Sequence, residues 1–454
     1  MGEFPFLDVP RMGGGMVIAA IAVFHVILAH YAVGTGLLLY AFERADRDGI
    51  HAGIQRMIEL LGKSVIYLNF VIGAISGVGI WFAISLYSPD ATQHLIQKFV
   101  WLWATEWTVF AVEIAVGYLY YYRRAALAPA ARRRLAGIYA LFTWGSLLVI
   151  TGILSYMLTS KEGNALVAWN NASAWPSVML RTLSAVALAC LVVLLLSAIR
   201  PLFAFARDSA EAQGVYRVVY RLLQAFFLLL PLALWYRLTI PDHSASWAEG
   251  SSIPISMFLA ATVFFSLLVT VVAWYALRRG RPLQAEAAFL LLAMGIATTF
   301  TAEFVREGIR KPYIIYPVLY SNGIWTADLA EWQRRAAALG SVLAVDRLYL
   351  GTPRERVLGA WQVPATAALP ELSATERGEY LYRAQCMICH TREGFNRLDH
   401  LTRAWSDTDY AAGVVRNLHL SKPFMPPFVG TERDIADLVA YLRTLNPGEA
   451  AHGQ

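Results

Sequence analysis

Five consecutive residues near the C-terminal end can attach a haem covalently. Cys386-Met387-Ile388-Cys389-His390 has the CxxCH spacing, in which two thiols add across the haem vinyl groups and the histidine ligates the iron. A chance match, or a zinc or redox CxxC pair, is the alternative interpretation. The motif predicts one covalent haem c, with His390 as an iron ligand.

The second iron ligand should be a soft side chain in a rigid loop further along the chain. Met425 lies among prolines in Lys422-Pro423-Phe424-Met425-Pro426-Pro427-Phe428, and these prolines restrict the backbone that carries the thioether. His400 and His419 are the alternative ligands, and either would give a lower reduction potential. We expect one helix over 375–385 and another over 432–445, packed across each other. Residues 372–446 thereby resemble a class I cytochrome c.

Two histidines lie in a long apolar segment and could bind further haems. Of nine histidines, only His25 and His30 fall within predicted membrane spans, which excludes an arrangement with two histidines on each of two helices. Positions five apart on one helix point about 140° away from each other. His25 and His30 therefore serve two haems, or one of them is not a ligand. Buried histidines in a membrane are usually functional.

Carboxylates mark two further places in the apolar part of the chain. Glu106 and Glu113 are seven residues apart in one span, which puts them on one helix face about 10 Å apart. Such groups inside a membrane indicate a proton path or metal ligation, or carboxylates paired with arginine or tryptophan. Glu303 and Glu307 precede Arg310 at the end of the last span. Cations there could pair with haem propionates or simply anchor the helix at the interface.

The elements that position these residues are mostly membrane helices. The 454 residues are 57% hydrophobic and only 15% charged, and apolar runs of about 20 residues are long enough to cross a bilayer. We therefore predict an all-α fold with eight transmembrane helices. Their approximate ranges are 14–42, 64–87, 98–122, 135–158, 177–200, 217–238, 254–277 and 284–305. Cys190 is alone in the fifth span and is interpreted as a core residue.

The cations are concentrated in alternate loops and predict the orientation. The loops after the first, third, fifth and seventh spans are rich in arginine. Residues 88–97 and 239–253, which lie in intervening loops, contain no Lys or Arg. Lys/Arg-rich short loops remain in the cytoplasm, so both termini are expected outside. The start of the chain lacks a basic segment and a cleavage site, which favours a true first span over a signal peptide. Bacteria attach haem c outside this membrane, in agreement with the predicted side of His390.

The composition predicts three parts. Residues 1–323 form the haem-binding membrane bundle, 324–371 form a linker with an amphipathic helix over about 326–345, and 372–454 form the extracytoplasmic cytochrome c domain. The net charge of +6 is a topology signal in the loops and does not suggest a nucleic-acid partner.

Residues 15–320 resemble subunit I of the cytochrome bd-type quinol oxidases. His25, followed nine residues later by Gly34, matches the first-helix ligand of the oxygen-reducing haem. Glu106 and Glu113 match the pair of third-helix glutamates implicated in ligation and proton delivery. The segment Glu307-Gly308-Ile309-Arg310-Lys311-Pro312-Tyr313 is similar to the signature Glu-x-Gly-Arg-Gln-Pro-Trp. The resemblance makes Glu307 the axial ligand of a high-spin haem b, with Glu303 in reserve.

The chain also departs from that family. The fifth span has no histidine for the low-spin haem b, so Met257 in the seventh span has no partner ligand. The quinol-binding loop is reduced to about 239–253, and a cytochrome c domain stands in place of a ninth span. We infer from these departures that haem c replaces the usual outer redox centre.

Three functions agree with these residues. The chain is a cytochrome c-coupled, bd-type oxygen-reductase subunit, an electron-transfer subunit without oxygen chemistry, or a membrane anchor with a redox tail. The first two require one or two non-covalent haems of b or b/d type besides haem c. The expected partners are a second membrane subunit, resembling bd oxidase subunit II or another respiratory subunit, a soluble periplasmic electron donor or acceptor, and the lipid of the cytoplasmic membrane.

Overall fold

The computed structural model describes residues 9, 11–279, 283–345, 372–405 and 407–446. Arg281 in the seventh loop, His452 and the part of the predicted linker at 346–371 lie outside the described residues. By its internal contacts the chain divides into two compact units. Unit 1 is Met1–Ile21, Gly79–Leu95 and Arg310–Gln454, and unit 2 is Ala22–Val78 and Ile96–Ile309.

The eight predicted membrane spans are confirmed as helices among the described residues. Each is long and apolar enough to cross a bilayer. They are α1 (Gly14–Ala45), α2–η1–α3 (Ala52–Ser64, Val65–Gly73, Ala74–Tyr87), α5 (Val100–Arg123), α6 (Pro129–Tyr156), α7 (Ala174–Ala198), α9–η4–α10 (Ala210–Leu223, Gln224–Leu228, Leu229–Thr239), α12 (Ile253–Arg279) and α13 (Ala285–Gly308). Short helices in the connections are α4 (Pro89–Lys98), η2 (Arg124–Ala126), η3 (Ala165–Ala168), α8 (Arg200–Phe203), α11 (Asp242–Ser246) and η5 (Trp247–Ser251).

The second and sixth spans begin earlier than the apolar runs suggest. Their first segments, α2 and α9, are amphipathic, and the two helices pack against each other. The amide of Gly53 donates to the Glu211 carboxylate at 2.8 Å, and a Cβ at Gly53 would lie 2.3 Å from the Glu211 carbonyl oxygen. This close contact needs glycine, and it lies in the helical turns that precede the apolar segments.

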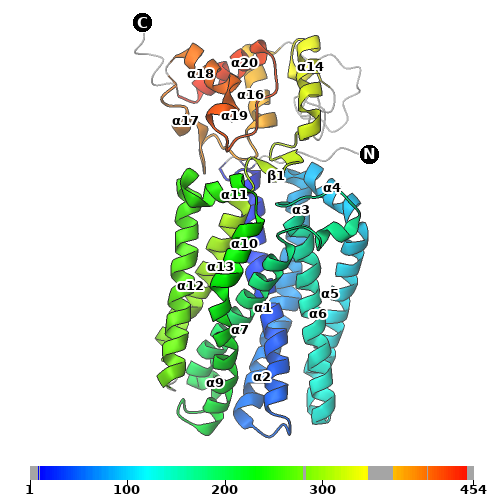
Figure 1. Cartoon of the computed structure of the whole chain (residues 1–454), viewed down its shortest axis with the longest axis vertical. Helices are drawn as coiled ribbons and strands as arrows, with labels where there is room; N and C mark the ends of the chain where they lie inside the picture. Colours follow the sequence, from blue (N-terminus) through cyan, green and yellow to red (C-terminus); the bar gives the residue numbers. More distant parts are fainter. Residues whose placement is uncertain (1–8, 10, 280–282, 346–371, 406, 447–454) are drawn as a thin grey trace. The chain divides into compact units, whose positions relative to one another are not determined.

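Unit 2 is a bundle in which α7 is the most buried span. More than half of the residues in the most apolar stretch of α7 are buried, whereas the corresponding share is 17–39% in the other spans. Helices α6 and α13 pack on α7, while α5 pairs with α6 and α12 with α13 (Figure 1). Gly34 of α1 lets that helix approach α7, because a Cβ there would lie 1.9 Å from the Ala185 carbonyl oxygen.

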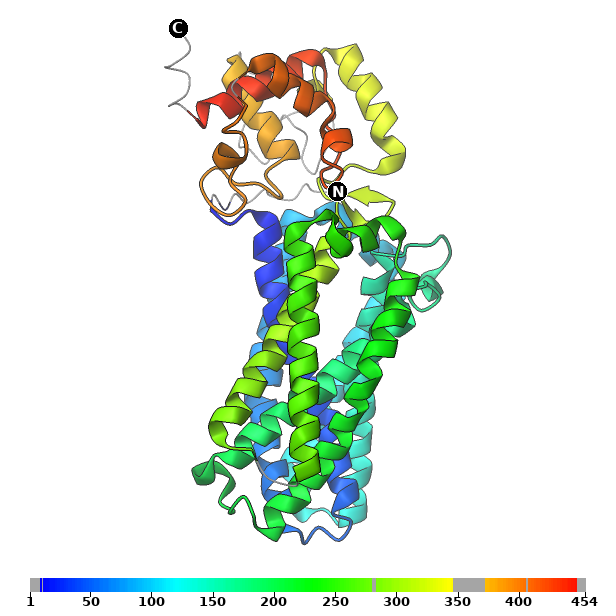
Figure 2. The same ribbon diagram turned by 60° about the vertical axis from the view of Figure 1, so that its left-hand side comes forward.

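Unit 1 contains the expected small helical domain. Two of its helices, α16 (Ala374–Gln385) and α20 (Glu432–Thr444), pack across each other, as predicted (Figure 2). The remaining elements of this part are β1 (Tyr313–Ile315), β2 (Leu319–Tyr320), η6 (Thr326–Asp328), α14 (Leu329–Leu339), η7 (Val342–Ala344), α17 (Leu398–Leu401), α18 (Thr408–Arg416) and α19 (Leu418–Ser421). β1 and β2 form an antiparallel pair in which Tyr313 faces Tyr320.

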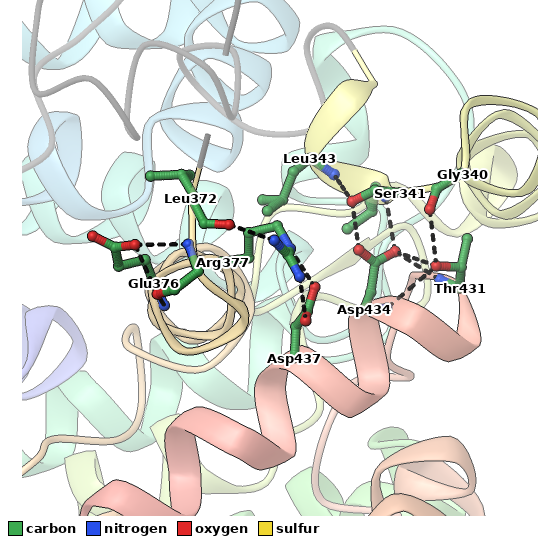
Figure 3. Close-up of polar contacts among 11 residues, drawn as sticks. Gly340, Ser341, Leu343, Leu372, Glu376, Arg377, Thr431, Asp434 and Asp437 are labelled. Carbon is green, nitrogen blue, oxygen red and sulfur yellow. Dashed lines mark hydrogen bonds and ion pairs between the residues drawn. The ribbon is translucent and has the colours of Figure 1, made fainter. Parts of the chain in front are cut away.

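The crossing of α16 and α20 depends on a glycine and an ion pair. A Cβ at Gly378 would lie 2.0 Å from the Asp437 carbonyl oxygen, so the backbones touch at this point. One residue earlier, the Arg377 guanidinium donates to both Asp437 carboxylate oxygens, at 2.6 and 2.8 Å (Figure 3). A bidentate arginine–carboxylate pair restricts orientation as well as distance, and it fixes the angle at which the two helices meet.

Part of the segment predicted as a linker packs on this helical domain. The Ser341 hydroxyl and the Val342 amide both donate to the buried Asp434 carboxylate of α20 (Figure 3). Gln333 of α14 exchanges two hydrogen bonds with the backbone of Gly430. The domain boundaries at 323 and 371 stay a prediction.

Candidate functional site

The CxxCH motif continues directly from α16. A capping box between Ser373 and Glu376 begins the helix, and the amides of Cys386 and His390 donate to carbonyls one turn earlier. Both thiols are free and lie three residues apart on this turn. The buried Tyr382 hydroxyl donates to the His390 carbonyl at 3.0 Å and closes the turn.

The ring of His390 is prepared to ligate iron. Its Nδ1 lies 3.2 Å from the Asn396 carbonyl oxygen. Because a carbonyl can only accept, Nδ1 carries the hydrogen and Nε2 keeps the lone pair, which is the usual arrangement of a metal-ligating histidine. Burial also lowers the pKa of His390 and keeps the ring neutral. The residues present therefore fit a c-type haem, which supplies one-electron redox chemistry when bound.

The loop that carries Met425 is attached to the end of α16. The Gln385 side chain, next to Cys386, donates to the Val429 carbonyl at 2.6 Å and accepts from the Val429 amide at 3.0 Å. Within the loop, the Met425 amide donates to the Lys422 carbonyl. The structure thus brings the segment of the expected second ligand to the segment of the first.

His419, one of the alternative iron ligands, is hydrogen-bonded to the backbone of Met425. Its Nδ1 is 2.6 Å from the Met425 carbonyl oxygen and must donate to it. Its ring also lies against Tyr320 of β2, with the ring centroids 6.1 Å apart, and Tyr320 stacks on Tyr313 at 4.7 Å. His400 is exposed on α17.

His25 is oriented by the π-helical segment of the second span. Its Nδ1 lies 3.1 Å from both the Gly73 carbonyl oxygen and the Ser76 hydroxyl. Gly73 ends η1, a π-helix, and such wide turns often occur at functional sites. When Nδ1 donates to Gly73, Nε2 of His25 is available for a metal.

His30 faces a buried charged cluster. Its Nδ1 donates to the Val26 carbonyl of its own helix at 2.8 Å, which leaves Nε2 as the acceptor nitrogen. The imidazole is 5% exposed and lies within electrostatic range of Arg181 and Glu303. The structure therefore brings together His30 and Glu303, two predicted site residues from α1 and α13.

Glu303 is held by two guanidinium groups. Arg181 of α7 donates to one of its carboxylate oxygens and Arg306 to the other, each at 2.7 Å. Glu307 lies one turn further on and is 3.8 Å from Arg306. Sequence reasoning missed Arg181. A single arginine in an otherwise apolar span was the available signal.

Glu106 and Glu113 lie along α5 as predicted by their spacing, and they have different surroundings. Glu106 accepts a hydrogen bond of 3.2 Å from the Ser146 hydroxyl of α6. Glu113 is only 5% exposed and interacts electrostatically with Glu106 and with the fully buried Tyr139. The pair thus faces α6.

Arg310 and Lys311 belong to unit 1. The buried Arg310 guanidinium donates to the Ile314 carbonyl at 3.0 Å. The Lys311 amino group lies 3.9 Å from the Cys389 sulfur. The signature-like segment after α13 thus contacts the CxxCH motif within this unit, a relation that spacing along the sequence does not reveal.

Comparisons with known proteins agree with this arrangement. Residues 373–442 match a family described as Cytochrome C oxidase, cbb3-type, subunit III. Among solved structures, the chain is similar to the bd oxidase of Geobacillus thermodenitrificans, with 14% sequence identity and a TM-score of 0.57 over 67% of this chain and 88% of that one. No curated protein matches the chain. The chain therefore joins a membrane bundle with a bd oxidase-like fold to a cytochrome c domain, as predicted.

Proposed function

We propose that this chain transfers electrons between a covalent haem c and one or two haems inside its membrane bundle, as a subunit of a respiratory complex. The observation that carries the proposal is the ring of His390, whose Nδ1 is hydrogen-bonded to a carbonyl so that Nε2 can ligate iron. Two free thiols and a hydrogen-bonded Met425 loop belong to the same domain. The other part of the chain has a bd oxidase-like fold. In this proposal Cys386 and Cys389 attach haem c, while His390 and Met425 ligate its iron.

The bundle haems are assigned to histidine and glutamate side chains of α1 and α13. His25 holds one haem and Glu307 ligates a second, with His30 and Glu303 as the neighbouring alternatives. Arg310 is assigned to the haem propionates. The charge pattern of the loops supports a location in the cytoplasmic membrane, with the cytochrome c domain outside. The proposed partners are a second membrane subunit and a soluble periplasmic electron carrier.

Oxygen reduction is the first specific activity proposed for the bundle. His25 and His30 diverge on one helix and are the only histidines of the predicted spans, so neither can complete a bis-histidine pair for the other. An iron held by His25 would therefore lack a second histidine ligand, and Glu106 and Glu113 would supply the protons for oxygen reduction. An electron-transfer subunit whose haems have no open position is the alternative, and a redox-tailed anchor without bundle haems is the third candidate.

One set of spectra tests these alternatives. The pyridine haemochrome assay of the purified full chain should give one covalent haem c and at least one extractable haem. Finding haem c alone would contradict electron transfer into the bundle and leave the anchor. Carbon monoxide should shift the reduced spectrum if the bundle reduces oxygen. If every haem is indifferent to carbon monoxide, the electron-transfer subunit remains. His25→Ala should lose an extractable haem, whereas the exposed-site control His400→Ala should not.

A further inference from the structure

Five arginines around the turn between α5 and α6 separate into two groups. Three of them donate to polar groups of unit 2: Arg124 to Glu43 and Gln55, Arg132 to Gln55, and Arg133 to the Arg47 carbonyl. The other two, Arg123 and Arg134, have no hydrogen bond or ion pair with any residue in the described part of the chain. Their two charges are therefore available to a ligand.

Both of these arginines line one open hollow. It has a volume of about 620 Å³ and lies between the end of α5, η2 and the start of α6. Apart from Arg123 and Arg134, its lining is apolar and includes Leu119, Leu135 and Ile138 beside several alanines. The small alanine side chains leave the space, and the leucine and isoleucine side chains provide a surface for a hydrocarbon chain.

The neighbouring side chains indicate the depth of this hollow in the bilayer. Tyr122, next to Arg123, is 67% exposed, and exposed tyrosines at the ends of membrane helices lie at the level of the lipid headgroups. Leu119 and Ile138 lie about one turn from the two arginines, further into their spans, and are also exposed. The arginines are thus at headgroup level, and Leu119 and Ile138 are at acyl-chain level, while the alanines of the lining belong to the turn beyond them.

We propose that this hollow binds an anionic glycerophospholipid. Arg123 and Arg134 hold the phosphate, since the guanidinium group matches phosphate oxygens in a bidentate manner. One acyl chain lies along Leu119, Leu135 and Ile138. A zwitterionic phosphatidylcholine binds less well, because its choline cation adds a positive charge next to two unpaired arginines. Basic pockets between membrane helices are known to select anionic headgroups.

The test counts phosphatidylglycerol bound to the full-length protein in detergent by native mass spectrometry. Wild type should retain phosphatidylglycerol in preference to phosphatidylcholine. The double variant Arg123→Gln/Arg134→Gln should bind it at least about tenfold more weakly, since the loss of even one charge-assisted contact is worth about that factor. Arg217→Gln/Arg221→Gln, which changes the same charge on α9 away from the hollow, should behave as wild type. An unchanged haem spectrum shows that each variant has folded.

Two further arms distinguish the lipid from other ligands. Ala130→Trp keeps both arginines but fills the hollow, and it should also weaken phosphatidylglycerol binding. Inorganic phosphate in excess should not displace the lipid, because it has no acyl chain. The proposal is wrong if the double variant retains phosphatidylglycerol like wild type, if phosphate alone competes fully, or if the purified complex shows a protein subunit covering these arginines.

Discussion

The amide of Gly15, in the first turn of α1, donates a hydrogen bond of 3.0 Å to the carbonyl of Ile388, inside the CxxCH motif. A second bond joins the Phe395 amide to the Arg11 carbonyl at 3.0 Å. Backbone groups at both ends of the haem-attachment loop are therefore satisfied by residues 11–15. Residues 11–15 therefore belong to the surroundings of the CxxCH motif within unit 1.

Gly394 makes this contact possible, and replacing it should separate the two segments. A Cβ at position 394 would lie 1.8 Å from the Arg11 carbonyl oxygen, so Gly394→Ala forces the backbones apart and should cost about 1–3 kcal/mol of stability. Hydrogen exchange should become faster at the amides of Phe395 and Gly15.

Gly413→Ala is the matched control for this change. A Cβ at that position of α18 meets no atom within 4 Å, and alanine favours the helix, so exchange at Phe395 should not change. Equal effects of the two substitutions would contradict a specific contact between residues 11–15 and the motif.

His419→Ala should loosen the loop that carries Met425, the proposed second ligand of haem c. The change removes the 2.6 Å hydrogen bond to the Met425 carbonyl, which is worth about 1.4 kcal/mol. Added imidazole competes with Met425 for ferric iron. It should therefore bind about tenfold more tightly to the variant than to wild type. The weak far-red band of sulfur-ligated ferric haem should fade. Tyr320→Leu, which removes the ring beside His419, should act in the same direction, and His400→Ala should have no effect.

A wild type without the far-red band would contradict Met425 as ligand. A band and imidazole affinity unchanged by His419→Ala would contradict only the positioning role.

Before haem attachment, Cys386 should be an unreactive thiol at neutral pH. Burial, with a smaller contribution from Cys389, raises the pKa of Cys386 to about 12. Only the thiolate reacts, so alkylation should rise about tenfold per pH unit between about pH 7 and pH 10 without reaching a plateau. The measurement uses the haem-free chain with Cys190→Ala and Cys389→Ser, which leaves one thiol. A plateau near the ordinary thiol pKa of about 8.5 would contradict the raised pKa of Cys386.

The apolar runs predicted the eight spans, and the CxxCH motif with its flanking helices predicted the cytochrome c domain. The structure confirms both, because each depends on residues that are close together in the sequence. The sequence did not reveal the π-helix of Val65–Gly73 that orients His25, because an extra residue per turn is set by packing and leaves no trace in composition. The Gly13-Gly14-Gly15 run was visible in the sequence, and its close contact with the haem-attachment loop was not inferred. The ligand set of the bundle stays a prediction.

The Arg181–Glu303–Arg306 cluster was also beyond sequence reasoning, and it gives a test of what Glu303 does. Its members come from α7 and α13, so only the folded bundle brings them together. If Glu303 serves to neutralise these guanidinium groups, Glu303→Gln leaves Arg181 without its carboxylate partner and Arg306 with only the longer contact to Glu307. It should then destabilise the protein by about 3–5 kcal/mol, which thermal unfolding in detergent would detect.

The haem content of the same variant separates an ion-pair role from ligation. An ion-pair role predicts lower stability with every extractable haem retained at low temperature, whereas ligation predicts loss of a haem or a change in its spin state. Glu286→Gln, at an exposed position in the first turn of the same helix, should change neither property. Because Arg306 also lies 3.8 Å from Glu307, Glu307→Gln should cost less stability than Glu303→Gln. If Glu307 is the haem ligand, that variant should lose the haem that Glu303→Gln keeps.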